Sequence, residues 1–600
     1  MTIAPYAAGT AASDLNTRRL LGLKGQLDGL STQLATGRVS ETYGGLGAGR
    51  ATSLSARAQI SALDGYDAAI EAGTTRLKLA SASIEQAASL ASQTWSEIGN
   101  TVASSGASAR ASLQGIAAGR LGGMLDALNQ SVADQYIFGG RETDRPPVET
   151  ASRILNGDPA AGLDGVGAVI AERGAADLGT ASPATGRLGL TRAGNAVTLS
   201  ESADPAVRTN FGFTIAGAVS SNLAALTATP TAATAPRFDA AFASQPRDGD
   251  LVRVTVQNPD GSQGFVDLVA RTAPAAGAAN TFRIGASAAE SADNLEAALA
   301  GQVPVGLQSA APPGASASLT GGTPASVAVT VVDQPRIGDT VRLTLGLRDG
   351  TSHTLTLTAA APGTTGTGSF ALGATPDATA ANLSAALAGA LDTAAQTDLA
   401  ASSATRAASD FFAGSSTPGL APRRVVLDAA GEAAGYAADP SGRTLIWYTG
   451  DDTAPDARRT ATLQVSAGEA VAVGVQANEP ALRDALAGIA VLASVTFTSS
   501  DRDNARFGAF ADRLKPLVKP SEGRQSIEEI GTELSLASSR IESQKSQNGA
   551  TRAVLQDAIG GIEDANVEEV AAKLLTLQTQ LQASYQTTSM LSKMSLVNYL

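Results

Sequence analysis

Residues 20–34 read LLGLKGQLDGLSTQL, and five leucines of this stretch set the pattern for the chain. They are spaced alternately by three and four residues, at Leu20, Leu23, Leu27, Leu30 and Leu34. This heptad spacing places all five on one face of an α-helix, whereas Arg18, Arg19 and Lys24 lie off that face. The stretch therefore predicts an N-terminal helix whose narrow apolar stripe needs a partner.

The C-terminal end shows the same pattern of a helix with a leucine stripe. Asn566 and Glu569 form a variant capping box, a signature of a helix start. The helix that follows carries a second leucine stripe, and the last residues add two more leucines. We assign a helical assembly seam to the two stripes together: Leu20, Leu23, Leu27, Leu30, Leu34, Leu574, Leu577, Leu581, Leu591, Leu596 and Leu600.

Three further helices are predicted between the terminal ones. Apolar residues recur every seven positions across 52–103, and a shorter periodic stretch covers 107–136 before a double glycine. On the C-terminal side, a capping box at Ser526 starts a helix that we expect Gly560 and Gly561 to end.

Between about 150 and 500 the pattern changes to short alternating strands with Gly and Pro turns. This region contains an internal repeat, in which residues 245–256 match residues 334–345. Each copy continues through an Asp-Gly turn, a Phe-x-x-Gly-Ala motif and the helix start Asn-Leu-x-Ala-Ala-Leu-Ala. We therefore expect two copies of one strand-hairpin-strand-helix module.

The expected fold class is α+β and multidomain, with long N- and C-terminal helices paired in a coiled-coil or helical-bundle stem and β-rich modules inserted in the middle. The expected segments are the N-terminal helix of the terminal coiled coil (1–44), the N-terminal part of a helical core (45–145), a β-rich variable region (146–240), repeat module 1 (241–330), repeat module 2 (331–420), a β-rich returning segment (421–500), the C-terminal part of the helical core (501–562) and the C-terminal helix of the terminal coiled coil (563–600).

The composition argues against several kinds of function. The 600 residues contain 43 Lys+Arg and 56 Asp+Glu, a net charge of −13, without the basic cluster that nucleic acid requires. There is no cysteine, and the single histidine, His353, leaves no two-histidine metal site. No apolar run is long enough to span a membrane, and the start lacks the pattern of a cleaved signal peptide. We expect no cofactor, no metal, no nucleic acid and no membrane insertion.

Several features resemble sites without meeting the requirements of one. The glycines of 45–49 follow a helix, whereas a dinucleotide fingerprint follows a strand. His353 sits on an alternating strand and is expected to face solvent. The acidic residues of 563–569 are interpreted as charge at a helix N-terminus, and those of 248–250 and 451–452 as turn residues. We expect that the protein is not an enzyme.

The leucine stripes allow two interpretations. They either form an ordinary bundle within one chain, or they are completed by neighbouring chains. The stripes are narrow and rich in alanine, so that one chain buries little apolar area per helix. The helices also lie at the chain ends, where a monomer tends to fray. Both features favour assembly.

Three segments resemble the flagellin superfamily of bacterial flagellar axial proteins, and within it the hook-filament junction proteins. They are residues 30–38, residues 134–147 with Tyr-Ile-Phe-Gly-Gly and a later Pro-Pro, and the tail 577–600, which ends Ser-Leu-Val-Asn-Tyr-Leu. The resemblance covers roughly 1–150 and 500–600. Flagellins usually carry an Asp-Asp-Ala-Ala-Gly-type stretch after the first helix, and residues 40–49 do not match it.

The resemblance implies a structural subunit of the bacterial flagellum, extracellular and exported without a cleaved signal by the flagellar type III apparatus and its chaperone. The implied partners are copies of the same chain in a ring, hook-associated protein 1 and flagellin. Two alternatives are a flagellin-type filament subunit and a secreted adhesin whose repeats bind a ligand. The central region is longer than in compact relatives, and its role stays open.

Overall fold

The computed structural model describes residues 6–104, 106–275, 278–454, 456–498, 500–519 and 523–593. Its contacts divide the chain into two compact units. Unit 1 comprises Met1–Thr75, Leu463–Val471 and Ala537–Leu600, and unit 2 comprises Arg76–Thr462 and Ala472–Leu536. The expected α+β class is confirmed, with long terminal helices and a strand-rich middle.

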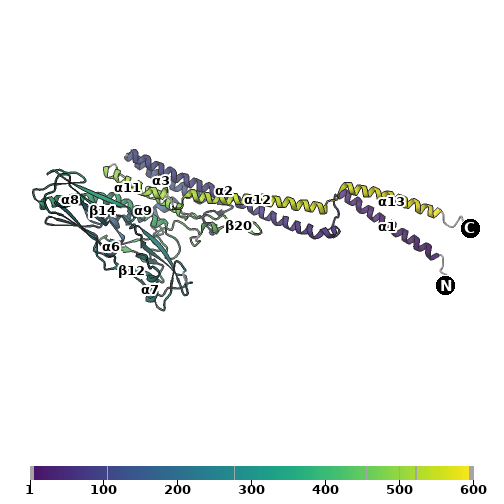
Figure 1. Cartoon of the computed structure of the whole chain (residues 1–600), viewed down its shortest axis with the longest axis horizontal. Helices are drawn as coiled ribbons and strands as arrows, with labels where there is room; N and C mark the ends of the chain where they lie inside the picture. Colours follow the sequence, from purple (N-terminus) through teal and green to yellow (C-terminus); the bar gives the residue numbers. More distant parts are fainter. Residues whose placement is uncertain are drawn as a thin grey trace. The chain divides into compact units, whose positions relative to one another are not determined.

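Unit 1 consists mainly of paired helices. Its elements are α1 (Tyr6–Thr36), the 3₁₀ helix η1 (Tyr43–Gly49), the start of α2 (Arg50–Ser104), most of the hairpin β19 (Thr462–Ser466) and β20 (Glu469–Ala472), the end of α12 (Ile527–Glu563), and α13 (Val567–Lys593). In Figure 1, α1 and α13 lie side by side. Ion pairs link α2 to α12, with Arg552 contacting Asp64 at 2.9 Å and Lys545 contacting Glu71 at 3.3 Å.

The prediction that Gly560 and Gly561 end a helix is wrong, because α12 continues to Glu563. Glycine costs about 1 kcal/mol in a helix interior, which is a weak preference that tertiary contacts override. Here the carboxylate of Glu563 contacts Ser53 and Arg57 of α2, so the last turn of α12 is fixed by contacts outside the helix.

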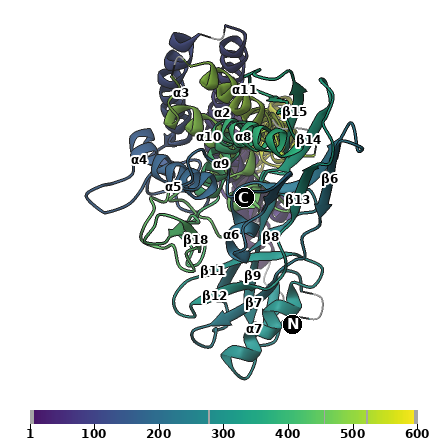
Figure 2. The same cartoon turned by 90° about the vertical axis from the view of Figure 1, so that its left-hand side faces the viewer.

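Unit 2 combines helices with three four-stranded sheets and several two-stranded sheets. Its helices are α3 (Ala107–Leu128), α4 (Ala151–Asn156), α5 (Val166–Leu178), α6 (Pro205–Asn210), α7 (Ala288–Ala298), α8 (Pro376–Ala394), the π-helical turn η2 (Ala395–Leu399), α9 (Ala400–Phe412), the 3₁₀ helix η3 (Ala457–Thr460), α10 (Pro480–Ser494) and α11 (Asp501–Val518), together with the adjoining parts of α2 and α12. Figure 2 shows α9, α10 and α11 close together, and α10 also packs on α3.

The strands of unit 2 form two four-stranded sheets around the repeats, a third four-stranded sheet and several hairpins. The strands are β1 (Ser131–Val132), β2 (Gln135–Tyr136), β3 (Gly189–Ala193), β4 (Ala196–Ser200), β5 (Thr214–Ser220), β6 (Leu226–Thr231), β7 (Arg237–Phe242), β8 (Leu251–Gln257), β9 (Gln263–Arg271), β10 (Thr281–Arg283), β11 (Pro304–Ser309), β12 (Ala315–Thr320), β13 (Ser326–Val331), β14 (Thr340–Gly346), β15 (Ser352–Ala360), β16 (Ser369–Ala371), β17 (Val425–Leu427) and β18 (Ala433–Tyr436). The larger sheets have the orders β10-β9-β8-β11, β16-β15-β14-β5 and β3-β4-β13-β6.

The two sequence repeats fold alike. Each contains an antiparallel hairpin, β8–β9 or β14–β15, then a short parallel strand, β10 or β16, and then a helix, α7 or α8. The asparagine that both repeats share has the same role in each, since it connects the helix to the short parallel strand. Asn294 donates to the backbone oxygen of Arg283 at 3.0 Å, and Asn382 donates to that of Ala371 at 2.8 Å. The fourth strand differs: β11 follows the first repeat in sequence, whereas β5 precedes the second.

The predicted helix 107–136 is too long. The helix α3 ends at Leu128, and a short hairpin of β1 and β2 follows. Ala133 and Asp134 between the strands have φ values of 49° and 59°, the left-handed conformation of tight hairpin turns. The Phe-Gly-Gly motif comes next, and a Cβ at Gly139 would lie 1.9 Å from a backbone oxygen. The glycine of this motif therefore allows a close approach of two backbone segments, and the motif does not end the helix.

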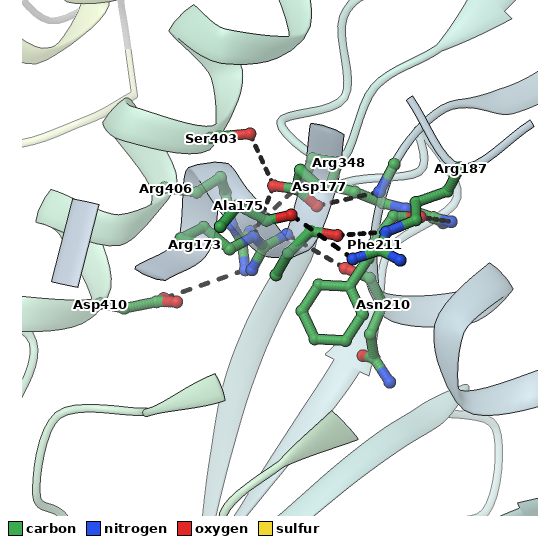
Figure 3. A network of polar contacts seen from close by, with 12 residues as sticks. Arg173, Ala175, Asp177, Arg187, Asn210, Phe211, Arg348, Ser403, Arg406 and Asp410 are labelled. Atoms are coloured by element: carbon green, nitrogen blue, oxygen red, sulfur yellow. Dashed lines mark hydrogen bonds and ion pairs between the residues drawn. The ribbon is translucent and has the colours of Figure 1, made fainter. Parts of the chain in front are cut away.

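A buried polar network ties α5 to α9 (Figure 3). The guanidinium of Arg173 contacts Asp177 at 2.6 Å and donates to the backbone oxygen of Asn210 at 3.0 Å. Asp177 is 1% exposed and also accepts from the backbone amide of Gly212 at 2.9 Å and the hydroxyl of Ser403 at 2.6 Å. The carboxylate is thus fully surrounded by donors, as a buried charge requires.

Two more buried arginines connect this network to the repeats. Arg348, from the hairpin loop of the second repeat, donates to the backbone oxygen of Phe211 at 3.2 Å. Arg406 of α9 donates to the backbone oxygen of Gln263, in the first repeat, at 2.6 Å. Burial lowers the pKa of Arg348 to about 10, and burial also lowers the pKa of Arg406. Arg406 also donates to the backbone oxygen of Arg348 at 3.4 Å, so that both repeats are held to α9 by one charged side chain in the interior of unit 2.

We predict that Asp177→Asn lowers the free energy of unfolding of unit 2 by about 3–5 kcal/mol, because it leaves the charge of Arg173 buried without a carboxylate partner. Urea unfolding followed by tryptophan fluorescence measures this change, since Trp95 and Trp447 both lie in unit 2.

Asp377→Asn is the matched control. The carboxylate of Asp377 is 61% exposed and contacts Arg192 at 2.9 Å. We expect its loss to cost less than about 1 kcal/mol, because solvent screens an exposed ion pair. Equal effects of the two substitutions would show that the buried pair contributes no more than a surface pair.

Candidate assembly interface

The seam leucines of α1 pack against α13. Leu20, Leu23, Leu27 and Leu30 are half-buried along one face of α1, as their spacing predicts. On α13, Leu574 and Leu577 are half-buried, and Leu581 is 9% exposed. The two helices run antiparallel, because the end of α1 lies beside the start of α13, where the amide of Ala565 donates to the oxygen of Gly37, and both helices extend away from this point (Figure 1).

The remaining seam residues have other positions. Leu34 is 38% exposed, and Gln33 takes the half-buried position next to it, donating to the backbone oxygen of Val39 at 2.8 Å. Leu591 belongs to α13, but its side chain is not among those described. Leu596 and Leu600 lie outside the described residues. Their assignment to the seam stays a prediction.

The packing between α1 and α13 is loose. A groove of about 610 Å³ runs along the pair, with Gly29 and Leu30 on one side and Thr576 and Leu577 on the other. A Cβ added at Gly22, Gly25 or Gly29 would meet nothing within 4 Å. Small residues on α1 therefore leave space beside the leucines, and one chain does not fill it.

Large apolar side chains also lie on the outer faces of the pair. Leu15 and Leu21 of α1 are 53% and 64% exposed. On α13, Leu575, Tyr585 and Met590 are 64%, 58% and 66% exposed. We call these five side chains the outer apolar set. Sequence reasoning missed them because it followed the heptad stripe, although each is a large apolar residue at a position off that stripe.

The chain connects the two helix pairs of unit 1 through a hydrogen-bonded joint. The backbone amide of Ala565 donates to the oxygen of Gly37 at 2.8 Å, and the amide of Val39 donates to the oxygen of Glu563 at 2.7 Å. The carboxylate of Glu563 accepts from the Arg57 guanidinium at 2.9 and 2.5 Å and from the Ser53 hydroxyl. These bonds lower the pKa of Glu563 to about 2.

The acidic cluster at 563–569 has two roles rather than one. Glu568 and Glu569 lie in the first turn of α13, as the prediction of charge at a helix N-terminus requires. Glu563 instead lies at the last residue of α12 and pairs with Arg57. The glycines of 45–49 belong to η1 in the same joint, where a Cβ at Gly49 would lie 2.6 Å from Ile562.

The expected solvent-facing position of His353 is wrong. Its ring nitrogen Nδ1 lies 3.0 Å from the carboxylate of Asp398, and the side chain is 31% exposed. Asp398 also contacts Arg513 of α11 at 3.3 Å. The histidine therefore joins the second repeat to the π-helical turn and to α11. The turn interpretation of the other acidic pairs fits, since Asp250 accepts from the amide of Arg247 at 2.7 Å and Asp451 accepts from the amide of Thr453 at 2.9 Å.

Residues 521–600 match the family model of the bacterial flagellin C-terminal helical region. A comparison with curated proteins gives no match. The match covers the last 80 of the 600 residues and shows that this helical region is similar to the C-terminal region of bacterial flagellins. None of the described helices combines the length and the apolar character that crossing a membrane requires.

We predict that Glu563→Gln weakens the joint by about 1–2 kcal/mol at pH 6, because it removes charge-assisted hydrogen bonds to a partly exposed arginine. The folded state holds the pKa of Glu563 at about 2, below the 4.5 of an unperturbed glutamate, so its stabilisation is complete above about pH 4.5 and is lost as the pH falls towards 2. The difference between parent and variant should therefore shrink over this range.

Amide hydrogen exchange of the segment around residues 560–570, compared between parent and variant at each pH, measures this difference. Glu568→Gln is the matched control, because Glu568 is exposed. It should change exchange little at any pH. A Glu563→Gln effect of the same size at pH 2 as at pH 6 would contradict the assignment.

Proposed function

We propose that this chain is the hook-filament junction subunit of a bacterial flagellum, a counterpart of hook-associated protein 3, and that it assembles through the pair of α1 and α13. The family match supports the broader part of this proposal, a filament-type structural subunit. The finer part is supported by the resemblance of residues 134–147 to junction proteins and by residues 40–49, which lack the stretch usual in flagellins.

The observation that carries the assembly mechanism is the outer apolar set. Fully burying a large apolar side chain is worth about 1.5–3 kcal/mol, so covering the three leucines, the tyrosine and the methionine of this set supplies several kcal/mol per subunit. The seam leucines hold α1 to α13 within one chain, and the outer apolar set contacts adjacent subunits. Assembly then buries the outer apolar set, which the isolated pair of α1 and α13 leaves exposed to solvent.

The proposed partners come from the resemblance. Copies of the chain form a ring, with hook-associated protein 1 below and flagellin above. The chain reaches this place through the type III export apparatus with an export chaperone. The mechanism is mechanical, because interlocking helices transmit torque and bending between the hook and a stiffer filament without a catalysed reaction.

We predict that Leu21→Ser and Leu575→Ser each weaken association of subunits by roughly ten- to hundredfold, since each removes one buried leucine from the contact. Both side chains are 64% exposed in the single chain, so the helix content of the monomer should not change. Sedimentation velocity measures association, and circular dichroism measures helix content.

Ile337→Ser is the matched control, because Ile337 is 67% exposed but lies in the second repeat. It should leave association unchanged. If the control weakens association as much as the α1 and α13 variants, the interface is not on the terminal helices.

Removal of the gene separates the junction role from its two rivals. We expect hooks without filaments, and immunogold labelling of hook-filament particles should place the chain in a narrow band at the junction. Label along the whole filament would instead identify a filament subunit. Deletion of residues 155–420 tests the adhesin alternative, which predicts normal motility with loss of surface attachment.

A further inference from the structure

A cavity of about 550 Å³ in unit 2 is lined from the sheets of both repeats. Strand β11 of the first sheet and strand β5 of the second both contribute to the lining, together with α6 and the segment that joins β6 to β7. The volume is within the range of about 300–1,000 Å³ that small-molecule sites have. None of the described residues that line it belongs to α1 or α13, so the cavity is separate from the proposed assembly interface.

The charged side chains of the lining do not balance one another. They are Glu201, Arg208 and Arg348, so that two guanidinium groups accompany one carboxylate. That carboxylate is already satisfied, because its two oxygens accept from the backbone amides of Ile215 and Ala325 at 2.9 and 3.2 Å. The lining therefore carries one positive charge in excess, and all three charged residues are buried.

Neither arginine of the lining has a carboxylate partner. Arg208 is 4% exposed and donates to the backbone oxygens of Ala203 and Gly321 at 2.9 and 2.5 Å. Arg348 is 3% exposed and donates to the backbone oxygens of Arg208 and of Phe211 (Figure 3). Among the residues that the structure describes, neither guanidinium forms an ion pair, and the Nε of Arg348 has no hydrogen-bond partner.

Other buried arginines of unit 2 show the arrangement that burial of a charge normally requires. Arg173 contacts Asp177 at 2.6 Å, and Arg424 contacts Glu172 at 2.6 Å. A guanidinium that is buried without such a partner loses hydration that no ion pair replaces. Burial accordingly lowers the pKa of Arg348 to about 10. An anion in the cavity would supply the missing counter-charge.

The rest of the lining limits which anion fits. A guanidinium presents its donors in a planar fork that matches a carboxylate. One excess positive charge matches one negative charge, and the buried Glu201 would repel a second. Ala233, Pro304 and Val305 give the lining an apolar part, which a short carbon chain can cover.

We infer that this cavity binds a small monocarboxylate with a short apolar chain, and that the guanidinium groups of Arg208 and Arg348 are its charged contacts. Both groups already donate to backbone oxygens, so that their positions are fixed before the ligand binds. Binding here is independent of the proposed assembly role, because the two sites share no described residue.

The experiment uses the purified full-length chain and a matched pair of probes, butyrate and its neutral amide, butyramide, at constant ionic strength in chloride. Isothermal titration calorimetry measures affinity. Thermal unfolding followed by tryptophan fluorescence measures stabilisation of unit 2, which contains both tryptophans. We expect butyrate to bind at least roughly tenfold more tightly than butyramide, because only the carboxylate neutralises the excess charge. Acetate, which lacks most of the carbon chain, should bind more weakly than butyrate.

Arg208→Gln and Arg348→Gln should each weaken butyrate binding by roughly ten- to hundredfold, because each removes a charge-assisted contact. Arg348→Lys should retain part of the affinity, since it keeps the charge but loses the planar fork. Circular dichroism checks that each variant is folded.

Arg342→Gln is the matched control, since Arg342 is exposed on β14 and does not line the cavity. It should bind butyrate as tightly as the parent does. Equal affinity of the parent for butyrate and butyramide, or no binding of either, overturns the proposal without reference to any variant. Unchanged butyrate affinity in folded Arg208→Gln and Arg348→Gln also overturns it.

Discussion

The pairing of α1 with α13 is the contact on which the rest of unit 1 depends. A single helix with a narrow apolar stripe is only marginally stable in water, because helix nucleation is costly and the apolar stripe remains exposed to solvent. Each of the two helices supplies the other with a partner along the leucine seam. The joint at Gly37, Glu563 and Ala565 then fixes where the two helices meet, because its backbone hydrogen bonds link the segment after α1 to the segment between α12 and α13.

The sequence was most informative where one periodicity ran undisturbed. The leucine spacing predicted which face of α1 packs, and the capping box at Ser526 predicted the start of α12, where Ser526 and Glu529 exchange hydrogen bonds at 3.1 and 3.0 Å. The repeat predicted two similar modules. Each of these signals is local, so each can be recognised without knowing the tertiary structure.

The sequence was least informative where segments far apart in the chain pair with one another. Nothing in residues 214–220 indicates that β5 is the edge partner of β14, because strand pairing at long sequence separation leaves no local mark. The buried arginines have the same difficulty. Arg173 and Arg406 each have an aspartate four residues later on the same helix, which in sequence looks like an ordinary surface pair. Only the fold shows that these pairs are buried and that Ser403 and Arg423 also contact Asp177 and Asp410.

In the candidate assembly interface, too, some residues could be predicted from the sequence and others could not. The stripe leucines were found because they are periodic, whereas the outer apolar set was missed because its members share no spacing.

The two units also differ in how they are stabilised, and this difference has a physical consequence. Aromatic residues are only 4% of the chain, and among the residues that the structure describes every fully buried large aromatic side chain, including Trp447 and Phe510, lies in unit 2. Unit 2 thus holds the large buried aromatic side chains of the described core. Unit 1 has loosely packed helices whose remaining apolar area faces outward. If subunits associate as proposed above, association stabilises the folded form of unit 1 by mass action, so that its order and the assembly of subunits are linked.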